Sequence, residues 1–226
     1  LVYSGVPIVF LFVHPDLCMS VLYICVLFVI IWLAGLPLSH FAILAVLGIG
    51  TIAAVFPFLA DYQQERITTF VSPEDADPDD LFNIEQAQIS IGSGGWWGKG
   101  YLNGTQSQLG FLRVQHTDFI FSVVTEEMGL IFGSLFVLLL MGFILWRILR
   151  VAWLTPDPAG KFICVGIATV IFFQTAVNIG MNVRLVPVTG LTLPFVSYGG
   201  SSLTTLFIGI GIVQSVLMRH RKQEFG

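Results

Sequence analysis

A carboxylate, Asp118, lies where a polar stretch of the chain meets an apolar one. His116 and Thr117 precede it, and an apolar run begins at Phe119. A carboxylate can accept a proton or hold a cation, and one kept at the edge of a membrane-spanning segment is costly, so Asp118 is a candidate for chemistry. The alternative is structural, because Thr117 or Asp118 could cap a helix that starts at Phe119. The two roles are compatible.

Two further polar segments meet apolar runs in the same way. Residues 194–202 read Pro-Phe-Val-Ser-Tyr-Gly-Gly-Ser-Ser and lead directly into an apolar stretch. Asp16 lies between two apolar runs in the string His-Pro-Asp-Leu. Pro15 would break a helix there, so Asp16 could cap the next helix. It could instead line a polar cavity and help to hold a cation or a sugar.

The composition indicates a membrane protein. Of 226 residues, 55% are hydrophobic and only 11% are charged, whereas soluble domains average about 25% charged residues. Nine of the fourteen acidic residues lie within residues 61–118, against three basic ones. This acidic excess argues against a nucleic-acid partner. The three cysteines all lie in apolar stretches, where cysteine behaves as a small hydrophobic residue.

Uncharged or nearly uncharged runs of about 20 residues predict transmembrane helices. Five such runs cover residues 18–36, 41–60, 128–146, 162–183 and 202–218. Residues 1–13 are apolar but shorter, and we interpret them as the outer end of a sixth helix. The predicted fold is therefore an all-α polytopic membrane protein with about five full transmembrane helices, part of a sixth and a long extracellular loop. Since the chain begins Leu-Val-Tyr, we expect it to be a piece of a longer protein.

Lysine and arginine in short loops predict the orientation in the membrane. They cluster between the third and fourth runs and again after the fifth (Arg147, Arg150, Lys161, Arg219, Arg221 and Lys222). Both segments should therefore be cytoplasmic, which places the loop 61–117 and the Pro/Gly-rich segment 184–200 outside. The expected organisation is transmembrane helices in 1–60, an extracellular loop with short helices in 61–117, and transmembrane helices with a cytoplasmic C-terminus in 118–226. Within the loop, the spacing of Leu81, Ile84, Gln88 and Ile91 predicts a helix over residues 81–91.

Several short strings, taken in order, resemble one known family. They start at residues 15 (Pro-Asp-Leu), 61 (Asp-Tyr-Gln), 91 (Ile-Gly-Ser-Gly-Gly), 98 (Gly-Lys-Gly), 104 (Gly-Thr-Gln-Ser-Gln-Leu), 116 (His-Thr-Asp-Phe-Ile-Phe), 126 (Glu-Glu-Met-Gly-Leu), 178 (Asn-Ile-Gly-Met) and 193 (Leu-Pro-Phe-Val-Ser-Tyr-Gly-Gly-Ser-Ser). The ordered set is similar to the SEDS family of bacterial cell-wall polymerases. The Gly-Thr-Gln-Ser-Gln string favours its elongation member, RodA, over its division member, FtsW.

The resemblance implies an activity and a partner. Family members have ten transmembrane helices and polymerise lipid II into glycan strands, as peptidoglycan glycosyltransferases of the bacterial cytoplasmic membrane with an active site on the outer face. They work with a class B penicillin-binding protein that crosslinks the product. The likeness covers about the C-terminal 60% of such a protein, so we expect this piece alone to be inactive.

The resemblance also implies roles for single residues. Asp118 matches the carboxylate that we expect to act as general base on a sugar hydroxyl. Six residues are expected to contact substrate: Asp16, Lys99, His116, Arg184, Ser197 and Tyr198. Lys99 and Arg184 would face the pyrophosphate, although Arg184 could equally hold lipid headgroups. Asp16 and Asp118 are the candidates for binding a divalent cation, Mg²⁺ or Mn²⁺. The chain departs from the family pattern at Cys18, at 113–115 and at Arg184.

Two other functions stay open at this stage. A lipid-precursor flippase or transporter would carry its ionisable sites near the membrane midplane, whereas Asp16 and Asp118 map to the outer rim. A truncated, non-catalytic subunit of a membrane complex is the other alternative. We further expect Glu126 or Glu127 to be buried and hydrogen-bonded. Gly209 and Gly211 would allow a partner's helix to approach closely, or they could equally serve packing within the bundle.

Overall fold

The computed structural model describes residues 17–37, 64, 69–70, 78–112, 114 and 116–224. The chain divides into two compact units, residues 1–75 and 76–226, and each is described by itself. Within the described residues every regular element is a helix. The prediction of an all-α polytopic membrane protein is thus confirmed for this part of the chain.

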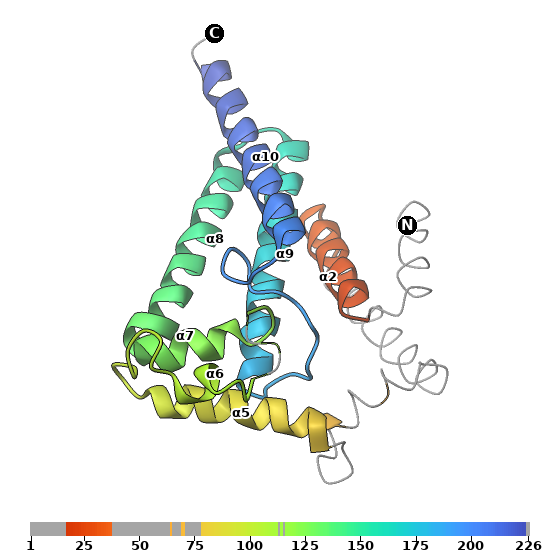
Figure 1. Ribbon diagram of the computed structural model, residues 1–226. Coiled ribbons are helices and arrows are strands. Elements are labelled where there is room, and N and C mark those ends of the chain that lie inside the picture. The colour runs from red at the N-terminus through yellow and green to blue at the C-terminus, as the bar shows by residue number, and fades with distance from the viewer. Residues whose placement is uncertain are drawn as a thin grey trace. The chain divides into compact units, whose positions relative to one another are not determined.

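The first unit contributes one described helix, α2 (Leu17–Leu33), which carries no charged residue (Figure 1). At 1.5 Å per residue, its 17 residues extend about 25 Å. The chain turns at Gly35, whose φ of 96° places it in the left-handed region, where glycine carries no steric penalty. Helix α2 therefore ends three residues before the end of the predicted run 18–36. The predicted span 41–60 and Asp16 lie outside the described residues.

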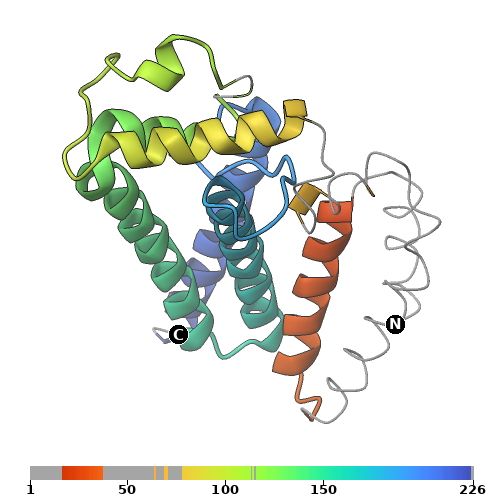
Figure 2. The same ribbon diagram turned by 90° about the horizontal axis from the view of Figure 1, so that it is seen from below.

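The second unit contains the remaining described helical elements, and Figure 1 labels its α-helices. They are α5 (Pro78–Gly94), α6 (Thr105–Gln108), α7 (Ile120–Gly129), a π-helical segment η3 (Leu130–Leu135), α8 (Phe136–Leu154), α9 (Pro158–Asn182) and α10 (Gly200–Glu224). The helix predicted from the spacing of residues 81–91 is α5, which extends further at both ends. Figures 1 and 2 show α5 lying alongside α7, and the two helices are in contact.

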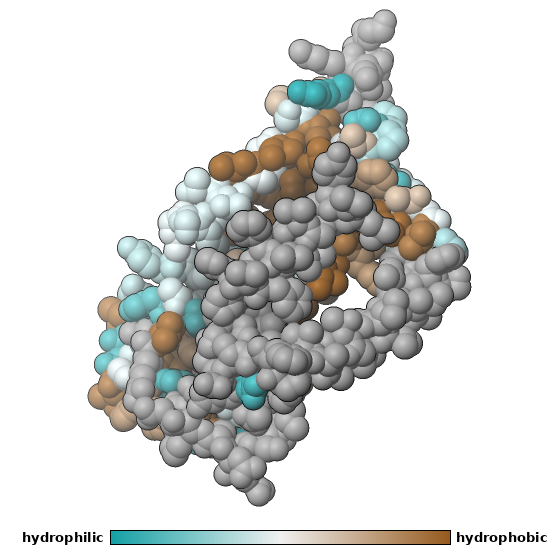
Figure 3. Space-filling view, turned by 90° about the vertical axis from the view of Figure 1, so that its right-hand side faces the viewer, coloured by the Kyte–Doolittle hydropathy of each residue, from teal (hydrophilic) through white to brown (hydrophobic). Residues whose placement is uncertain are grey.

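Three helical stretches of this unit are long and apolar enough to cross a membrane: Ile120–Leu154, Pro158–Asn182 and Gly200–Arg219. The first is longer than the predicted run 128–146, because α7, η3 and α8 continue one another. Only a minority of the residues on these stretches are buried, as expected for surfaces that face lipid or other helices. Figure 3 shows hydrophobic residues over much of the upper half of the visible described surface, with hydrophilic ones at the top.

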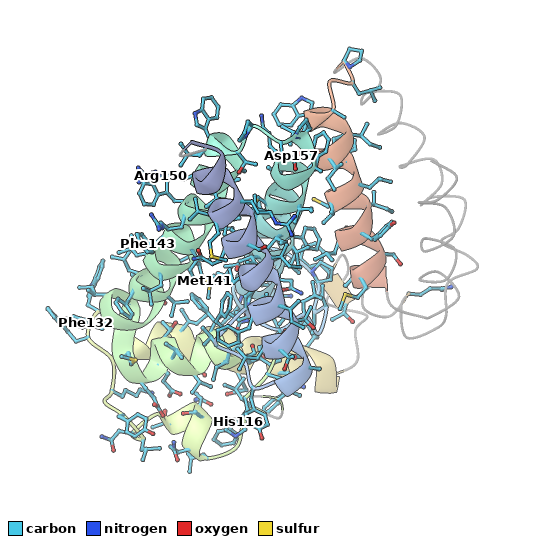
Figure 4. All side chains as sticks on the ribbon, turned by 90° about the horizontal axis from the view of Figure 1, so that it is seen from above. His116, Phe132, Met141, Phe143, Arg150 and Asp157 are labelled. Atoms are coloured by element: carbon cyan, nitrogen blue, oxygen red, sulfur yellow. The ribbon has the colours of Figure 1, made fainter. Side chains whose placement is uncertain are left out.

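The three long helices pack around an apolar core. Its buried members come from α8, α9 and α10 (Ile148, Val151, Ala152, Cys164, Ala168, Ile171, Leu206 and Val213). Helix α9 starts at Pro158 because the Asp157 carboxylate accepts hydrogen bonds from the amides of Ala159 and Gly160, at 3.3 and 3.1 Å. Asp157, and Arg150 near the end of α8, lie at the opposite end of the bundle from His116 (Figure 4).

The helix that begins as α7 is interrupted at Gly129, which has φ 78°. A glycine-rich loop supplies the backbone hydrogen bonds that the interruption would otherwise lose. The amides of Lys99 and Gly100 donate to the carbonyls of Glu126 and Glu127 at 3.0 and 2.9 Å. On the far side of the interruption, the amides of residues 130 and 131 donate to the carbonyls of residues 95 and 96, at 2.9 and 3.3 Å.

This backbone contact requires glycine on both sides. A Cβ built on Gly98 would lie 2.2 Å from the carbonyl oxygen of Glu127, and one on Gly129 would lie 2.3 Å from the amide nitrogen of Gly98. Neither position has room for a side chain, so part of the glycine-rich run 92–104 serves to join the outer loop to α7.

Residues 183–199, which we call the return segment, connect α9 to α10 without regular structure. Leu193 is buried against Phe121, Val137 and Met141, so the segment folds back onto α7 and α8. Phe195 packs against the same cluster and against the core of the long helices. Irregular backbone at the level of transmembrane helices is tolerated where protein covers it or where it lines a cavity. The Pro/Gly-rich segment 184–200 singled out in the sequence is thus irregular backbone that packs on α7 and α8.

Candidate active site

Three consecutive peptide carbonyls, those of His116, Thr117 and Asp118, accept hydrogen bonds from the C-terminal part of the chain. The amide of Tyr198 donates to the carbonyl of His116 at 2.9 Å. The hydroxyl of Ser197 donates to the carbonyl of Thr117 at 2.6 Å and accepts from the amide of Leu193 at 2.7 Å. The return segment therefore holds the peptide that carries Asp118, although 80 residues separate Ser197 from Thr117.

The carbonyl of Asp118 is bound by two asparagines of α9. The Nδ2 atoms of Asn178 and Asn182 each lie 3.1 Å from it. The residues are four apart, one helical turn, so both side chains leave α9 on the same face. Asn182 also accepts a hydrogen bond from the hydroxyl of Ser122 at 2.5 Å. Both asparagines are fully buried.

The Asp118 side chain itself is half-buried and lies next to the return segment. A Cβ added to Gly190, whose φ is 71°, would be 3.8 Å from Asp118 Oδ2. Helix α7 begins after this point, at Ile120, and its N-cap residue is Phe119, which makes no side-chain capping bond. The helix thus starts one residue later than expected, with Phe119 rather than Thr117 or Asp118 at its N-cap position.

Four of the other predicted contact residues lie on the return segment or bond to it: His116, Arg184, Ser197 and Tyr198. His116 and Tyr198 are exposed beside Asp118, where their backbones are joined. Arg184 follows directly after α9 in the left-handed region, at φ 58°, and is half-buried. Ser197 uses its hydroxyl on the backbone, which leaves one lone pair for any ligand.

Lys99 belongs to a separate polar cluster around Glu126. Its Nζ lies 2.9 Å from Glu126 Oε1 and 2.7 Å from the hydroxyl of Thr105. The Glu126 carboxylate is fully buried, and it also accepts from the backbone amides of Gln106 and Ser107 at 3.0 and 3.2 Å. The prediction that one of the two adjacent glutamates is buried and hydrogen-bonded is confirmed. Glu127 is half-buried and accepts one long bond, at 3.4 Å from the side chain of Gln108.

This arrangement can support proton transfer at Asp118 on a backbone that is fixed from several sides. Among the described residues, no three His, Cys, Asp or Glu side chains are grouped as they would be around a metal ion. Cation binding at Asp118 would therefore draw further ligands from outside the described residues or from a bound substrate.

Sequence reasoning did not single out Asn178 or Asn182 as site residues. A signal was present, because two asparagines one helical turn apart in a run long enough to cross a membrane are costly to bury without partners. The string at 178–181 contributed to the family resemblance, but the partner of its asparagine, a backbone carbonyl 60 residues earlier, has no sequence signature.

Comparison with known proteins identifies the family. The sequence model of the FtsW/RodA/SpoVE family, described as cell cycle proteins, matches residues 1–222. The chain belongs to this family. The resemblance inferred from the ordered strings is thereby confirmed.

Members of the FtsW/RodA/SpoVE family similar to this chain include two curated bacterial proteins. Peptidoglycan glycosyltransferase MrdB of Escherichia coli (strain K12) is 40% identical over 227 residues, an alignment that covers 97% of this chain and 61% of MrdB. Stage V sporulation protein E of Bacillus subtilis (strain 168) is 39% identical over 204 residues, covering 90% and 55% respectively. The chain thus spans little more than half the length of these relatives.

Solved structures of the same fold agree. A chain from a study of the structural coordination of polymerization and crosslinking by a peptidoglycan synthase complex has a TM-score of 0.75 at 34% identity, covering 94% of this chain and 57% of that one. The rod shape determining protein RodA of Thermus thermophilus has a TM-score of 0.60 at 29% identity, with coverages of 96% and 54%.

Proposed function

We propose that the full-length protein containing this chain is a peptidoglycan glycosyltransferase that polymerises lipid II into glycan strands during cell elongation. The observation that carries the proposal is the half-buried carboxylate of Asp118, on a peptide whose carbonyls are bound by α9 and the return segment. The curated relative MrdB is named as a peptidoglycan glycosyltransferase, and this supports the assignment.

In the proposed reaction Asp118 is the general base. It takes the proton from the attacking sugar hydroxyl while the new glycosidic bond forms at the anomeric carbon of the second substrate and the lipid pyrophosphate departs. A base must lie within hydrogen-bond reach of the proton that it removes, and a fixed peptide keeps the carboxylate in place for that step. His116 and Tyr198, exposed beside Asp118, would contact the sugars.

The leaving pyrophosphate needs positive charge. We propose Arg184 as its contact, because this side chain lies at the start of the return segment. Lys99 would contribute only the N–H of its ammonium group that remains, since Glu126 and Thr105 already accept from the other two. Asp118 and Asp16 are the proposed ligands of a Mg²⁺ or Mn²⁺ ion, which would neutralise phosphate charge.

The proposed location is the bacterial cytoplasmic membrane, with Asp118 on the outer face. Arg147 and Arg150 in the last turns of α8 and Lys161 in the first turn of α9 would then face the cytoplasm, and Arg150 lies at the opposite end of the bundle from His116 (Figure 4). We propose a class B penicillin-binding protein as the partner. The structural relative from a synthase complex that coordinates polymerization and crosslinking supports this, because a polymerase needs a crosslinking activity beside it.

The test is glycan-strand synthesis by the full-length protein, purified with its partner and supplied with lipid II. Asp118→Asn should abolish polymerisation, because an amide cannot take up the proton. The fold should persist, since Asn keeps the size of the side chain and the carbonyl that α9 binds. Glu127→Gln, a matched change of a half-buried carboxylate on α7, should retain activity.

Near wild-type strand synthesis by Asp118→Asn would show that Asp118 is not the base. Movement of lipid II across vesicle bilayers without strand synthesis would instead support the transporter alternative. If a well-folded full-length protein neither synthesises strands nor moves lipid II, the result would support the alternative of a non-catalytic subunit.

A further inference from the structure

Two buried asparagines converge on a single acceptor atom. Asn178 and Asn182 both direct Nδ2 at the carbonyl oxygen of Asp118, each at 3.1 Å, and both are fully buried on α9. Burying polar side chains on a helix that spans a membrane is unfavourable unless they find partners. The carbonyl that they share belongs to the residue proposed as the base.

Each asparagine is itself held in one orientation. Asn178 also donates to the carbonyl of Leu191 in the return segment, at 2.7 Å. Asn182 donates to the carbonyl of Asn178 at 2.8 Å and accepts from the hydroxyl of Ser122 on α7. The two side chains thus connect α9 to α7, to the return segment and to the Asp118 peptide.

The orientation of Asn178 follows from its neighbours. Its Oδ1 is buried and has no hydrogen-bond partner among the residues that the structure describes. Rotating the amide by half a turn would give that oxygen no benefit, because it would then face the carbonyls of Asp118 and Leu191, which cannot donate. The side chain therefore satisfies two backbone carbonyls while its own acceptor remains unsatisfied. A residue present only to fill space would not need this arrangement.

We propose that Asn178 and Asn182 are positioning residues for the Asp118 carboxylate, which they hold at the reacting hydroxyl by fixing its main-chain carbonyl. The inference rests on the proposed function of Asp118. It goes beyond that function by assigning the placement of the base to α9 rather than to α7, the helix that follows Asp118. The peptide plane sets the direction of the Cα–Cβ bond, so freeing the carbonyl frees the carboxylate. A misplacement of about 1 Å at a reacting group can cost on the order of 100-fold in rate.

The experiment measures kcat and KM for lipid II with the full-length protein and its partner. The variants are Asn178→Leu, Asn182→Leu and the double variant, because leucine has nearly the shape of asparagine and no donor. The matched control is Thr175→Val, which removes a buried hydroxyl of α9. Within the described part of the chain, this hydroxyl bonds only to its own helix, at the carbonyl of Ile171.

Because both donors share one acceptor, each single variant leaves the other bond in place. We expect a fall in kcat of about tenfold for each single variant and about 100-fold for the double, with KM changed less than about twofold. Thr175→Val should keep kcat within about twofold, since it does not touch Asp118. A purely structural role for the asparagines would lower the yield or thermal stability of the protein without this selective loss of kcat.

Three outcomes would overturn the proposal. They are a double variant with wild-type kcat, a loss confined to KM, and an equal loss in Thr175→Val. If the double variant does not fold, the single variants decide, because each must lose kcat while the control does not. Activity in Asp118→Asn would reject the base itself, whereas an inactive Asp118→Asn beside fully active asparagine variants would reject only the positioning role.

Discussion

Replacing Glu126 by glutamine should detach the outer loop from α7. The substitution keeps one oxygen but turns the other into a donor, so one of the two loop amides that now bind the carboxylate, those of Gln106 and Ser107, would face an N–H group. Losing a hydrogen bond to a charged acceptor costs about 1.5–3 kcal/mol. The lost ion pair with Lys99 adds less, about 1 kcal/mol, because the Lys99 side chain is 26% exposed and can be hydrated.

The combined loss of about 3 kcal/mol corresponds to roughly a 100-fold change in the equilibrium between closed and open loop. Hydrogen exchange measures this directly at the amides of Lys99 and Gly100. Both bond to α7 carbonyls that the substitution leaves in place. Their protection in the full-length protein should fall about 100-fold in Glu126→Gln.

Glu127→Gln is the matched control, since the only side-chain bond described for Glu127 is the 3.4 Å contact with Gln108. It should change protection at the same two amides by less than about threefold. Unchanged protection in Glu126→Gln would refute the reasoning, because it would mean that the glycine-rich backbone contacts hold the loop without the carboxylate. Equal losses in both variants would show a general effect of charge on α7 instead.

Three further outcomes are expected. Gly129→Ala should lower the thermal-unfolding midpoint strongly, because its Cβ would overlap the Gly98 backbone. Gly142→Ala is the control and should not lower the midpoint, because open space surrounds Gly142. Equal midpoints for the two variants would contradict the close contact. Gly211→Leu should weaken co-purification of the proposed penicillin-binding partner at least severalfold, since a Cβ there meets nothing within 4 Å and the face is free for a helix, while Gly142→Leu should not. In intact cells, a cysteine at Gly92 should react with an impermeant thiol reagent and one at Ala159 only after lysis, both sites being exposed; the reverse pattern would invert the proposed topology.

The two glycines of α10 differ in their surroundings. Gly209 and Gly211 were each expected to admit a partner's helix or to serve packing within the bundle. A Cβ on Gly209 would meet Ile167 of α9 at 3.5 Å, so this glycine faces inside the bundle. The spacing of two glycines on a helix does not say which neighbour each one faces, and here the packing of α10 on α9 separates them.

The sequence was sufficient for features that depend on local pattern. The apolar runs predicted the three long helices, and the spacing of residues 81–91 predicted α5. The cost of exposing a carboxylate to lipid correctly predicted that Glu126 or Glu127 is buried and hydrogen-bonded. These features follow from composition and periodicity over short stretches, where the physical cause lies in neighbouring residues.

Features that depend on distant pairs could not be predicted. Nothing near Gly129 shows that a loop 30 residues earlier repairs the helix backbone there. The sequence likewise does not show that the Asp118 carbonyl binds α9, or that α7 starts at Ile120 rather than at Phe119. Asn178 and Asn182 have ordinary polar side chains until the fold brings them to a carbonyl far away in the chain.

The bonds to residues 116–118 bear on the order in which the protein matures. Chains are inserted from their N-terminus, yet the donors that fix the Asp118 peptide come 60 to 82 positions later: 60 for Asn178, 64 for Asn182, 80 for Ser197 and 82 for Tyr198. Contacts of such long range form late, because the intervening chain must be made and folded first. While α9 and the return segment are still inside the ribosome, Asp118 has entered the membrane region without the groups that hold it. On the proposed function, the Asp118 base is therefore held in its reacting position only after α9 and the return segment have been added.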